Sequence, residues 1–159
     1  MKELLFLALL ISACAHAQDA DTYYKKANEQ FNDRMYRNAA ESATKAIELN
    51  PSSIEYRWFR VQALFTSSAG EKELLTALSD LEVIRQTENS EKLYRSIGKI
   101  EYMLAQYYNT DFGNYTEAAK RFELSKSAFQ TAKKISGDSK YDYDIRDAET
   151  YLNELQAKK

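Results

Sequence analysis

Residues 36–51, YRNAAESATKAIELNP, decide the fold of this chain. Small side chains recur every three or four residues, at Ala39, Ala43 and Ala46, which is the spacing of one face of an α-helix. A face made of alanine lets a neighbouring helix approach closely, and Pro51 ends the helix. The stretch therefore predicts the second helix of a tightly packed pair.

The residues around this stretch predict the helices that flank it. Upstream, four apolar positions fall at helical spacing and a short polar turn follows them. These positions are Tyr23, Tyr24, Ala27 and Phe31. Downstream, Ser52 and Glu55 have the spacing of a capping box, which predicts the start of a further helix. Residues 20–53 thus form one helix–turn–helix unit.

This unit resembles a tetratricopeptide repeat (TPR), a helix–turn–helix of about 34 residues. The matching positions are Tyr23, Ala27, Phe31, Tyr36, Ala39, Ala46, Ile47, Leu49 and Pro51. Lys26 and Gln30 stand where the family usually has apolar residues, which suits a first repeat with no preceding neighbour. The resemblance implies an all-α fold, a right-handed superhelix of about three repeats followed by a capping helix, with about seven helices in total.

Two weaker copies of the unit follow, over residues 54–90 and 91–136. Both are longer than the family unit, and we expect the extra residues in linkers, around Thr66–Glu73 and around Tyr107–Gly113. Ser68 with Glu71, and Asn114 with Glu117, are predicted to cap the helices that follow these linkers. Gly98 occupies a position at which the family has a small residue.

A last amphipathic pattern predicts a capping helix over residues 139–157. Its apolar stripe is Tyr141, Ile145, Ala148, Leu152 and Leu155. A repeat array needs a terminal element with a polar outer face, and this pattern provides one.

The composition agrees with a helical chain and excludes several classes of function. The 159 residues include only four glycines and one proline, too few for a turn-rich β fold. Lys and Arg number 22 against 24 Asp and Glu, so the chain lacks the basic excess of a nucleic-acid-binding protein. The single Cys and the single His are Cys14 and His16. If the N-terminal segment is removed, no Cys- or His-based catalysis or zinc site remains, and we expect no enzyme and no cofactor.

Residues 1–17 predict an export signal. Lys2 precedes the apolar run Leu4–Ala13, which is too short to span a membrane and has the length of a signal core. Ala15-His16-Ala17 matches a signal-peptidase site that would leave Gln18 as the new terminus. Alternatively, Ile11-Ser12-Ala13-Cys14 resembles a bacterial lipobox, with Cys14 lipidated and retained. Both interpretations place a domain over residues 18–159 outside the cytoplasm, either periplasmic or secreted or held by a lipid anchor, and no later apolar run predicts a transmembrane span.

In the TPR family, ligands usually lie in a concave groove lined by the first helix of each repeat. The groove positions of the family fall on Asp21, Tyr24, Asn28 and Phe31, on Glu55, Trp58, Gln62 and Phe65, and on Lys92, Arg95, Lys99 and Tyr102. We expect Phe31, Phe65 and Tyr102 to pack between helices. The candidate partner-binding residues are therefore Tyr24, Asn28, Trp58, Gln62, Lys92, Arg95 and Lys99.

Chaperone-binding TPR proteins hold a C-terminal carboxylate with a Lys/Asn/Lys/Arg clamp. Asn28 and Lys92 match this clamp, but Tyr24 and Ser96 replace its first lysine and its arginine. The sequence therefore does not predict that ligand.

Three hypotheses of function follow. The first is a non-catalytic protein–protein interaction module or scaffold of the bacterial cell envelope, whose protein or peptide partner places an acidic segment against Lys92, Arg95 and Lys99. The second is a glycan- or small-molecule-binding protein that uses groove aromatics such as Trp58. The third, a hydrolase with a carboxylate pair such as Glu55 and Glu101, is the weakest, because no spacing singles out that pair.

The N-terminal segment yields the first prediction. Intact-mass analysis of protein purified from the cell envelope is expected to show a chain that begins at Gln18, because the A-x-A site directly precedes a polar and acidic stretch. An acylated Cys14 terminus would instead identify a lipoprotein. Retention of Met1 would contradict export.

Overall fold

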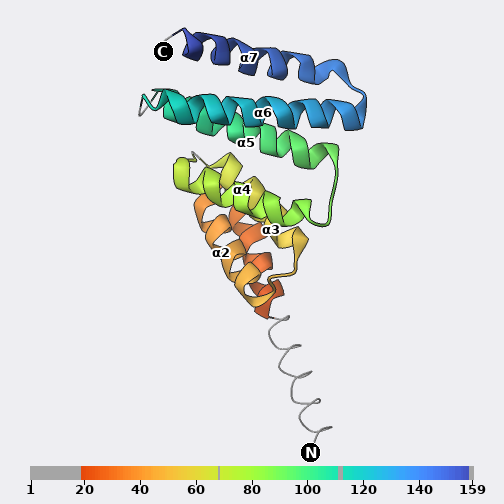
Figure 1. Cartoon of the computed structure of the whole chain (residues 1–159). Helices are drawn as coiled ribbons and strands as arrows, with labels where there is room; N and C mark the ends of the chain where they lie inside the picture. The colour runs from red at the N-terminus through yellow and green to blue at the C-terminus, as the bar shows by residue number, and fades with distance from the viewer. Residues whose placement is uncertain (1–18, 68, 111–112, 158–159) are drawn as a thin grey trace, which may run out of the picture. The chain divides into compact units, whose positions relative to one another are not determined.

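The computed structural model describes residues 19–67, 69–110 and 113–157, and all regular elements in these ranges are helical (Figure 1). The elements are a helix over residues 19–32, then α2 (Tyr36–Leu49), α3 (Ile54–Thr66), α4 (Glu71–Arg85), α5 (Glu91–Thr110), α6 (Tyr115–Ser136), the 3-10 turn η1 (Ser139–Tyr141) and α7 (Asp142–Gln156). The prediction of an all-α chain with about seven helices is confirmed for these residues. None of the helices described is both long and apolar enough to cross a membrane.

The chain divides into two compact units, Met1–Ser68 and Ala69–Lys159. The boundary falls in the second predicted repeat, between α3 and α4. The residues predicted to be a signal, including Cys14, lie outside the described part of the chain.

The N-terminal unit is built on the alanine face of α2. Ala39, Ala43 and Ala46 are fully buried, as their spacing predicts, and the bounds of α2 match the apolar pattern. The turn before α2 closes without a glycine: Arg34 takes a left-handed backbone conformation (φ 62°), and the Met35 amide donates to the Gln30 carbonyl at 2.8 Å. This tight turn folds residues 19–32 back against α2.

The start of α3 corrects one predicted cap. Ser53, rather than Ser52, precedes the helix, and its hydroxyl accepts a hydrogen bond from the Tyr56 amide at 3.3 Å. The Ser52 hydroxyl donates instead to the Asn50 side chain at 2.8 Å. The predicted cap is wrong by one residue because the turn after Pro51 includes Ser52, which delays the helix to Ile54.

One sequence prediction about a linker is wrong in the C-terminal unit. The helix α4 begins at Glu71 after Gly70, and Ser68, which was predicted to cap it, lies outside the described residues. Residues 107–110 belong to α5 and not to a linker. One cause is a long-range contact that local pattern does not reveal, because the Tyr108 hydroxyl donates to Glu71 and ties the last turn of α5 to the first turn of α4. The predicted cap at Asn114 is confirmed, since its side chain accepts from the Glu117 amide at 3.2 Å.

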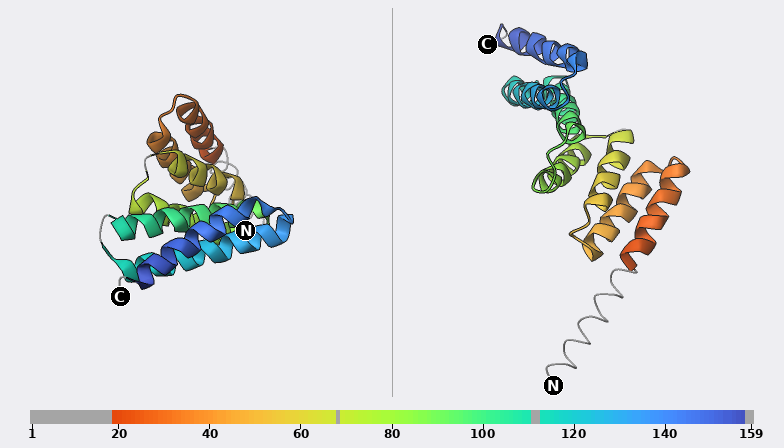
Figure 2. Two further views of the ribbon diagram at one scale, coloured as in Figure 1. Left: turned by 90° about the horizontal axis from the view of Figure 1, so that it is seen from above. Right: turned by 90° about the vertical axis from the view of Figure 1, so that its right-hand side faces the viewer.

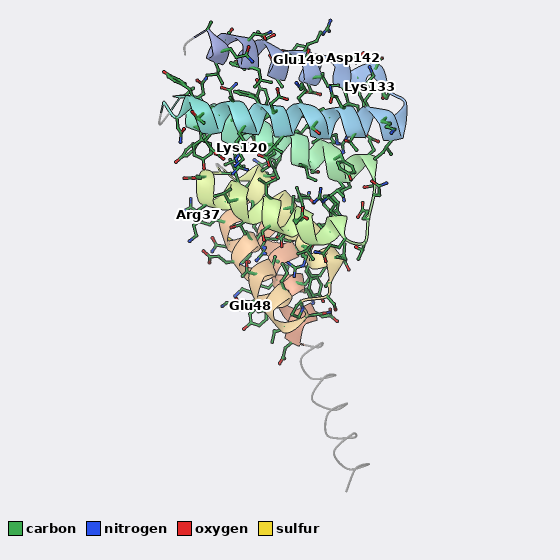
Figure 3. The ribbon with its side chains drawn as sticks, in the orientation of Figure 1. Arg37, Glu48, Lys120, Lys133, Asp142 and Glu149 are labelled. Carbon is green, nitrogen blue, oxygen red and sulfur yellow. The ribbon has the colours of Figure 1, made fainter. Side chains whose placement is uncertain are left out.

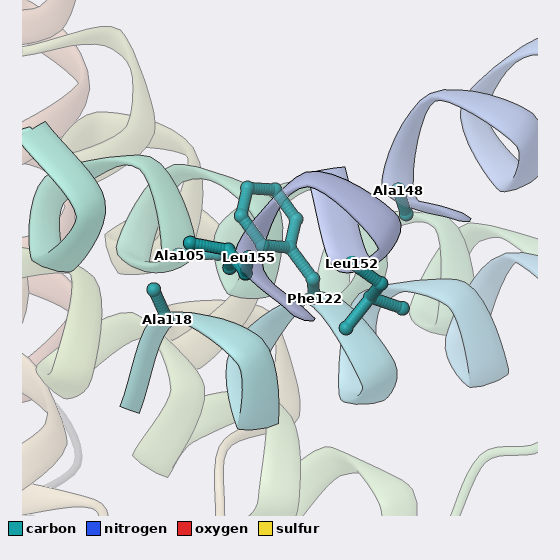
Figure 4. Close-up of a cluster of buried hydrophobic side chains, with 6 residues drawn as sticks. All are labelled: Ala105, Ala118, Phe122, Ala148, Leu152 and Leu155. Carbon is teal, nitrogen blue, oxygen red and sulfur yellow. The ribbon is translucent and has the colours of Figure 1, made fainter. Parts of the chain in front are cut away.

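The helix α7 covers the apolar face of α6, as expected for a capping helix. In the views of Figures 1 and 2, α6 packs against both α5 and α7. The central cluster consists of Ala105, Ala118, Phe122, Ala148, Leu152 and Leu155 (Figure 4). Nearer the start of α7, Tyr141 stacks on Phe129 with ring centroids 6.1 Å apart. An ion pair between Lys133 and Asp142, whose side chains are labelled in Figure 3, joins the end of α6 to the start of α7.

Gly98 sets how closely α5 and α6 approach. A Cβ atom at this position would lie 2.9 Å from Cε1 of Phe129. The ring of Phe129 has little room to move, because it is buried and stacks on Tyr141. The Ser125 hydroxyl donates to the Gly98 carbonyl at 2.9 Å, which adds a polar bond at the same crossing.

We predict that Gly98→Ala destabilises the protein by up to about 2 kcal/mol. Alanine raises helix propensity by about 1 kcal/mol, but overpacking against Phe129 costs about 1–3 kcal/mol and outweighs it. Denaturant unfolding measures the difference. In the background Phe129→Leu, where the ring is gone, the same substitution should be neutral or stabilising. A stabilising effect of Gly98→Ala in the native background would contradict the tight crossing.

Candidate functional site

The groove residues of the N-terminal unit lie on two adjacent helices, the helix over residues 19–32 and α3. The ring of Tyr24 packs on Tyr56 and Phe59 of α3, with centroids 4.7 and 5.3 Å away. Its hydroxyl donates to Glu55 at 3.1 Å. The Asn28 amide donates to the backbone carbonyl of Tyr24 at 2.9 Å. Tyr24 and Asn28 are thus brought together as predicted, but their polar groups are engaged within the chain.

The other aromatic and amide groove positions differ in exposure. Gln62 is exposed and Trp58 is half-buried on α3. Phe31 packs on Tyr36 and Phe59, as expected for a residue between helices. That expectation is wrong for Phe65, whose side chain is 39% exposed on the last turn of α3. The groove face of α3 therefore offers Gln62, Phe65 and part of Trp58 to a ligand.

The basic groove residues of the C-terminal unit stand on one face of α5. Lys92, Arg95 and Lys99 are all exposed, and their spacing of three and four residues keeps them on the same side of the helix. Tyr102 continues this face but is packed, as expected, against Phe122 at 5.4 Å between ring centroids. The three cations are the largest group of exposed like charges among the candidate residues.

Acidic residues of α7 and of the first turn of α5 adjoin this basic face, a feature that the sequence interpretation missed. Asp147 accepts a hydrogen bond from the Tyr102 hydroxyl. Burial raises the pKa of Asp144, and the charge of Lys99 partly offsets that rise. Glu91, whose pKa is lowered chiefly by a hydrogen bond from Tyr141, also interacts with Arg95. The only available signal was that Asp144 and Asp147 lie off the apolar stripe of α7, which does not reveal the helix they face.

Tyrosine–carboxylate hydrogen bonds join helices throughout both units. The pairs are Tyr24 with Glu55, Tyr56 with Asp21, Tyr102 with Asp147, Tyr108 with Glu71, and Tyr141 with Glu91. Each pairs a phenol with a carboxylate of a neighbouring element, and the pKa of each of these tyrosines is raised. For Tyr56 the hydrogen bond to Asp21 is the main cause, and its pKa rises to about 12. These contacts between neighbouring elements therefore depend on hydrogen bonds that require a protonated phenol.

The carboxylates considered for hydrolysis have structural partners. Glu101 is buried, and its carboxylate pairs with the Arg121 guanidinium at 3.0 Å. Burial raises the pKa of Glu101, and the bond to Arg121 opposes that rise. Arg121 also pairs with Glu117 at 2.9 Å, so the group joins α5 to α6. Glu55 is bonded to Tyr24, as described above.

Across residues 19–67, 69–110 and 113–157, no group of three or more His, Cys, Asp or Glu side chains is placed to hold a metal ion. Among the described residues, the exposed groove faces of α3 and α5 are the candidate binding surfaces.

Comparison with known proteins supports the fold at the level of structure. No protein-family model matches the sequence, and no curated protein matches it. Among solved structures, the chain is similar to the first TPR domain of Spaghetti (RPAP3), which was determined bound to the HSP90 peptide SRMEEVD. The TM-score is 0.55 and the sequence identity is 18%, over 89% of this chain and 93% of that chain. The chain therefore has the fold of a TPR domain, and the resemblance of residues 20–53 to that repeat is confirmed.

The raised pKa of Tyr56 yields a prediction about alkaline stability. A pKa of 10 in the unfolded chain and about 12 in the folded chain means that this bond contributes its full stability below pH 10 and loses it as the pH rises to about 12. Tyr56→Phe should lower the stability at neutral pH by about 1 kcal/mol and flatten its decline over that interval. Unfolding measured at several pH values tests both. The matched control is Tyr143→Phe, since Tyr143 is exposed. An equal effect of both substitutions would contradict the role of the Asp21 bond.

Proposed function

We propose that this chain is a non-catalytic module that binds a segment of a partner protein along the groove faces of its helices. The observation that carries the proposal is the exposed row of Lys92, Arg95 and Lys99 on α5 of a TPR fold. Three cations on one helix face attract an acidic segment and orient it during encounter. The solved TPR domain of RPAP3 supports a peptide as the kind of ligand, because that domain was determined bound to a peptide. The acidic residues of that peptide support an acidic segment.

The exposed side chains of α5 and α3 indicate which chemical groups a partner would carry. Asp144 interacts with Lys99 and Glu91 interacts with Arg95, so both acids reduce the net positive charge that a partner's acidic groups would meet on the basic row. Within the N-terminal unit, the face of α3 carries the exposed Gln62 and the half-buried Trp58. Trp and Arg are the residue types enriched at the energetic centres of interfaces. The carboxylate clamp of chaperone-binding relatives is incomplete here, so we do not propose an HSP90-type terminus as the ligand.

The proposal includes export to the bacterial cell envelope. It rests on the sequence of residues 1–17, with its short apolar run and the alternatives of cleavage after Ala17 or lipidation at Cys14. An exported scaffold would present its groove faces in the periplasm or at the cell surface.

Glycan binding is the alternative, and the geometry supports it less. Two of the polar groups that a sugar would need are engaged inside the chain, the Tyr24 hydroxyl with Glu55 and the Asn28 amide with a backbone carbonyl. Sugar hydroxyls would have to compete with these bonds.

A photo-cross-linking residue in place of Arg95 tests the proposed groove. Expressed in cells, it should cross-link to one partner segment, and Lys92→Glu with Lys99→Glu should abolish the product. The matched control is the same residue in place of Lys134, an exposed cation of α6 in the same unit.

The dependence of binding on ionic strength tests the role of the three cations separately. Binding of the purified partner should weaken as ionic strength rises, because exposed charges are screened over about 8–10 Å at physiological salt. If all variants are folded, cross-links from position 134 as strong as those from position 95 would contradict binding of the partner at the groove face of α5. Binding that ignores ionic strength would contradict only the acidic partner segment.

A further inference from the structure

A second surface lies within the C-terminal unit, between α4 and α6. The two helices form the walls of a cleft of about 530 Å³, and α5 forms its floor. Its apolar lining comes from all three helices: Leu75 and Leu78, Tyr94 and Ile97, and Leu124 and Ala128. This volume falls in the range of protein sites that bind ligands.

The walls leave large apolar side chains in water. Leu75 on α4 is 38% exposed and Leu124 on α6 is 42% exposed. Both side chains line the cleft, as do the partly buried Leu78 and Ile97. A contiguous apolar patch of this kind is typical of an interaction site, whereas single exposed leucines are not.

The charged residues that line the cleft pair with one another. Arg121 pairs with Glu101 at 3.0 Å, and Arg85 pairs with Glu82 at 2.8 Å. The cleft therefore presents equal numbers of positive and negative groups that already have partners. A charged side chain entering it would lose water and gain no free opposite charge, so the complementary occupant is uncharged where it is buried.

The backbone of the walls favours a helical occupant. Every lining residue lies inside α4, α5 or α6, where backbone amides and carbonyls bond within their own helix. An extended peptide would find no backbone partners there and would bury its own polar groups unpaired. A helix satisfies its backbone internally and needs only an apolar stripe. Ser79, Ser127 and Thr131 supply hydroxyls for the polar edges of such a stripe.

This surface is separate from the basic groove face. At about 100° per residue, Tyr94, Ile97 and Glu101 point to the opposite side of α5 from Lys92, Arg95 and Lys99. We infer that the cleft between α4 and α6 is a second docking site, which takes the uncharged apolar face of an amphipathic helix from a partner protein. The chain would then hold two partner elements on opposite faces of α5, one acidic and one apolar.

Synthetic peptides test this inference on the full chain. The probe is a fluorescent helix-forming peptide of zero net charge, with leucines at positions i, i+3, i+4 and i+7 on an Ala/Gln background. We expect saturable binding tighter than about 1 mM by anisotropy, and a loss of at least about tenfold in Leu124→Glu. The matched control is Ile135→Glu, because Ile135 is also on α6 and is 41% exposed but does not line the cleft. It should change the affinity less than about twofold, as should Arg95→Glu.

Several results would overturn the inference. These are no saturable binding, an equal loss in Ile135→Glu, or equal binding of the same peptide with a central proline. Displacement of the peptide by dodecanoate, with direct dodecanoate binding that Leu124→Glu abolishes, would assign the cleft to an acyl chain instead. A strong dependence on ionic strength would contradict an uncharged occupant. None of these outcomes bears on the basic groove, which the cross-linking experiment tests separately.

Discussion

The contact of Gly98 with Phe129 is the constraint on which the C-terminal unit depends. Without a Cβ at Gly98, the Phe129 ring sits directly on α5, and the same ring supports Tyr141 at the start of α7. The close crossing of α5 and α6 depends on the absence of a side chain at Gly98. The position of α7 depends in turn on that crossing, because Tyr141 stacks on Phe129. In the N-terminal unit, the buried alanines of α2 allow the same close approach. Small residues therefore set the helix spacing in both units.

Tyrosine–carboxylate hydrogen bonds also join these packed helices at their surfaces. A phenol can bury its ring between two helices and still reach a carboxylate at the surface. Tyr24 and Tyr102 do this at positions where the TPR family commonly places ligand-binding side chains. The structure thus assigns some groove positions to stability. In the function that we propose, recognition falls to exposed neighbours on the same faces, Gln62 on α3 and the cations on α5.

The parts of the fold that were predictable from sequence are those set by local pattern. The bounds of α2, the cap at Asn114 and the stripe of α7 follow from residues close together in the chain. Apart from the cap at Ser52, which the local turn after Pro51 displaces by one residue, and the exposure of Phe65, the wrong predictions concern contacts between distant residues. The extension of α5 through residues 107–110 is tied to a bond between Tyr108 and Glu71, and the acids beside Lys99 come from α7. The cleft walls were hidden for the same reason, because Leu75 and Leu124 look like ordinary members of amphipathic helices.

The two surfaces that we propose place two kinds of recognition on one helix, α5. Part of α5 packs against α6 at Gly98, where there is no room for a ligand, and part packs against α4. Two other sides differ in physical character. Lys92, Arg95 and Lys99 offer charge in water, whereas Tyr94 and Ile97 form the floor of an apolar cleft whose ions are already paired. Charge acts at a distance and speeds encounter, while apolar burial acts on contact and slows dissociation. A partner carrying an acidic segment and an amphipathic helix could therefore be steered by one side and retained by the other, with a gain in avidity that depends on the linker between its two elements.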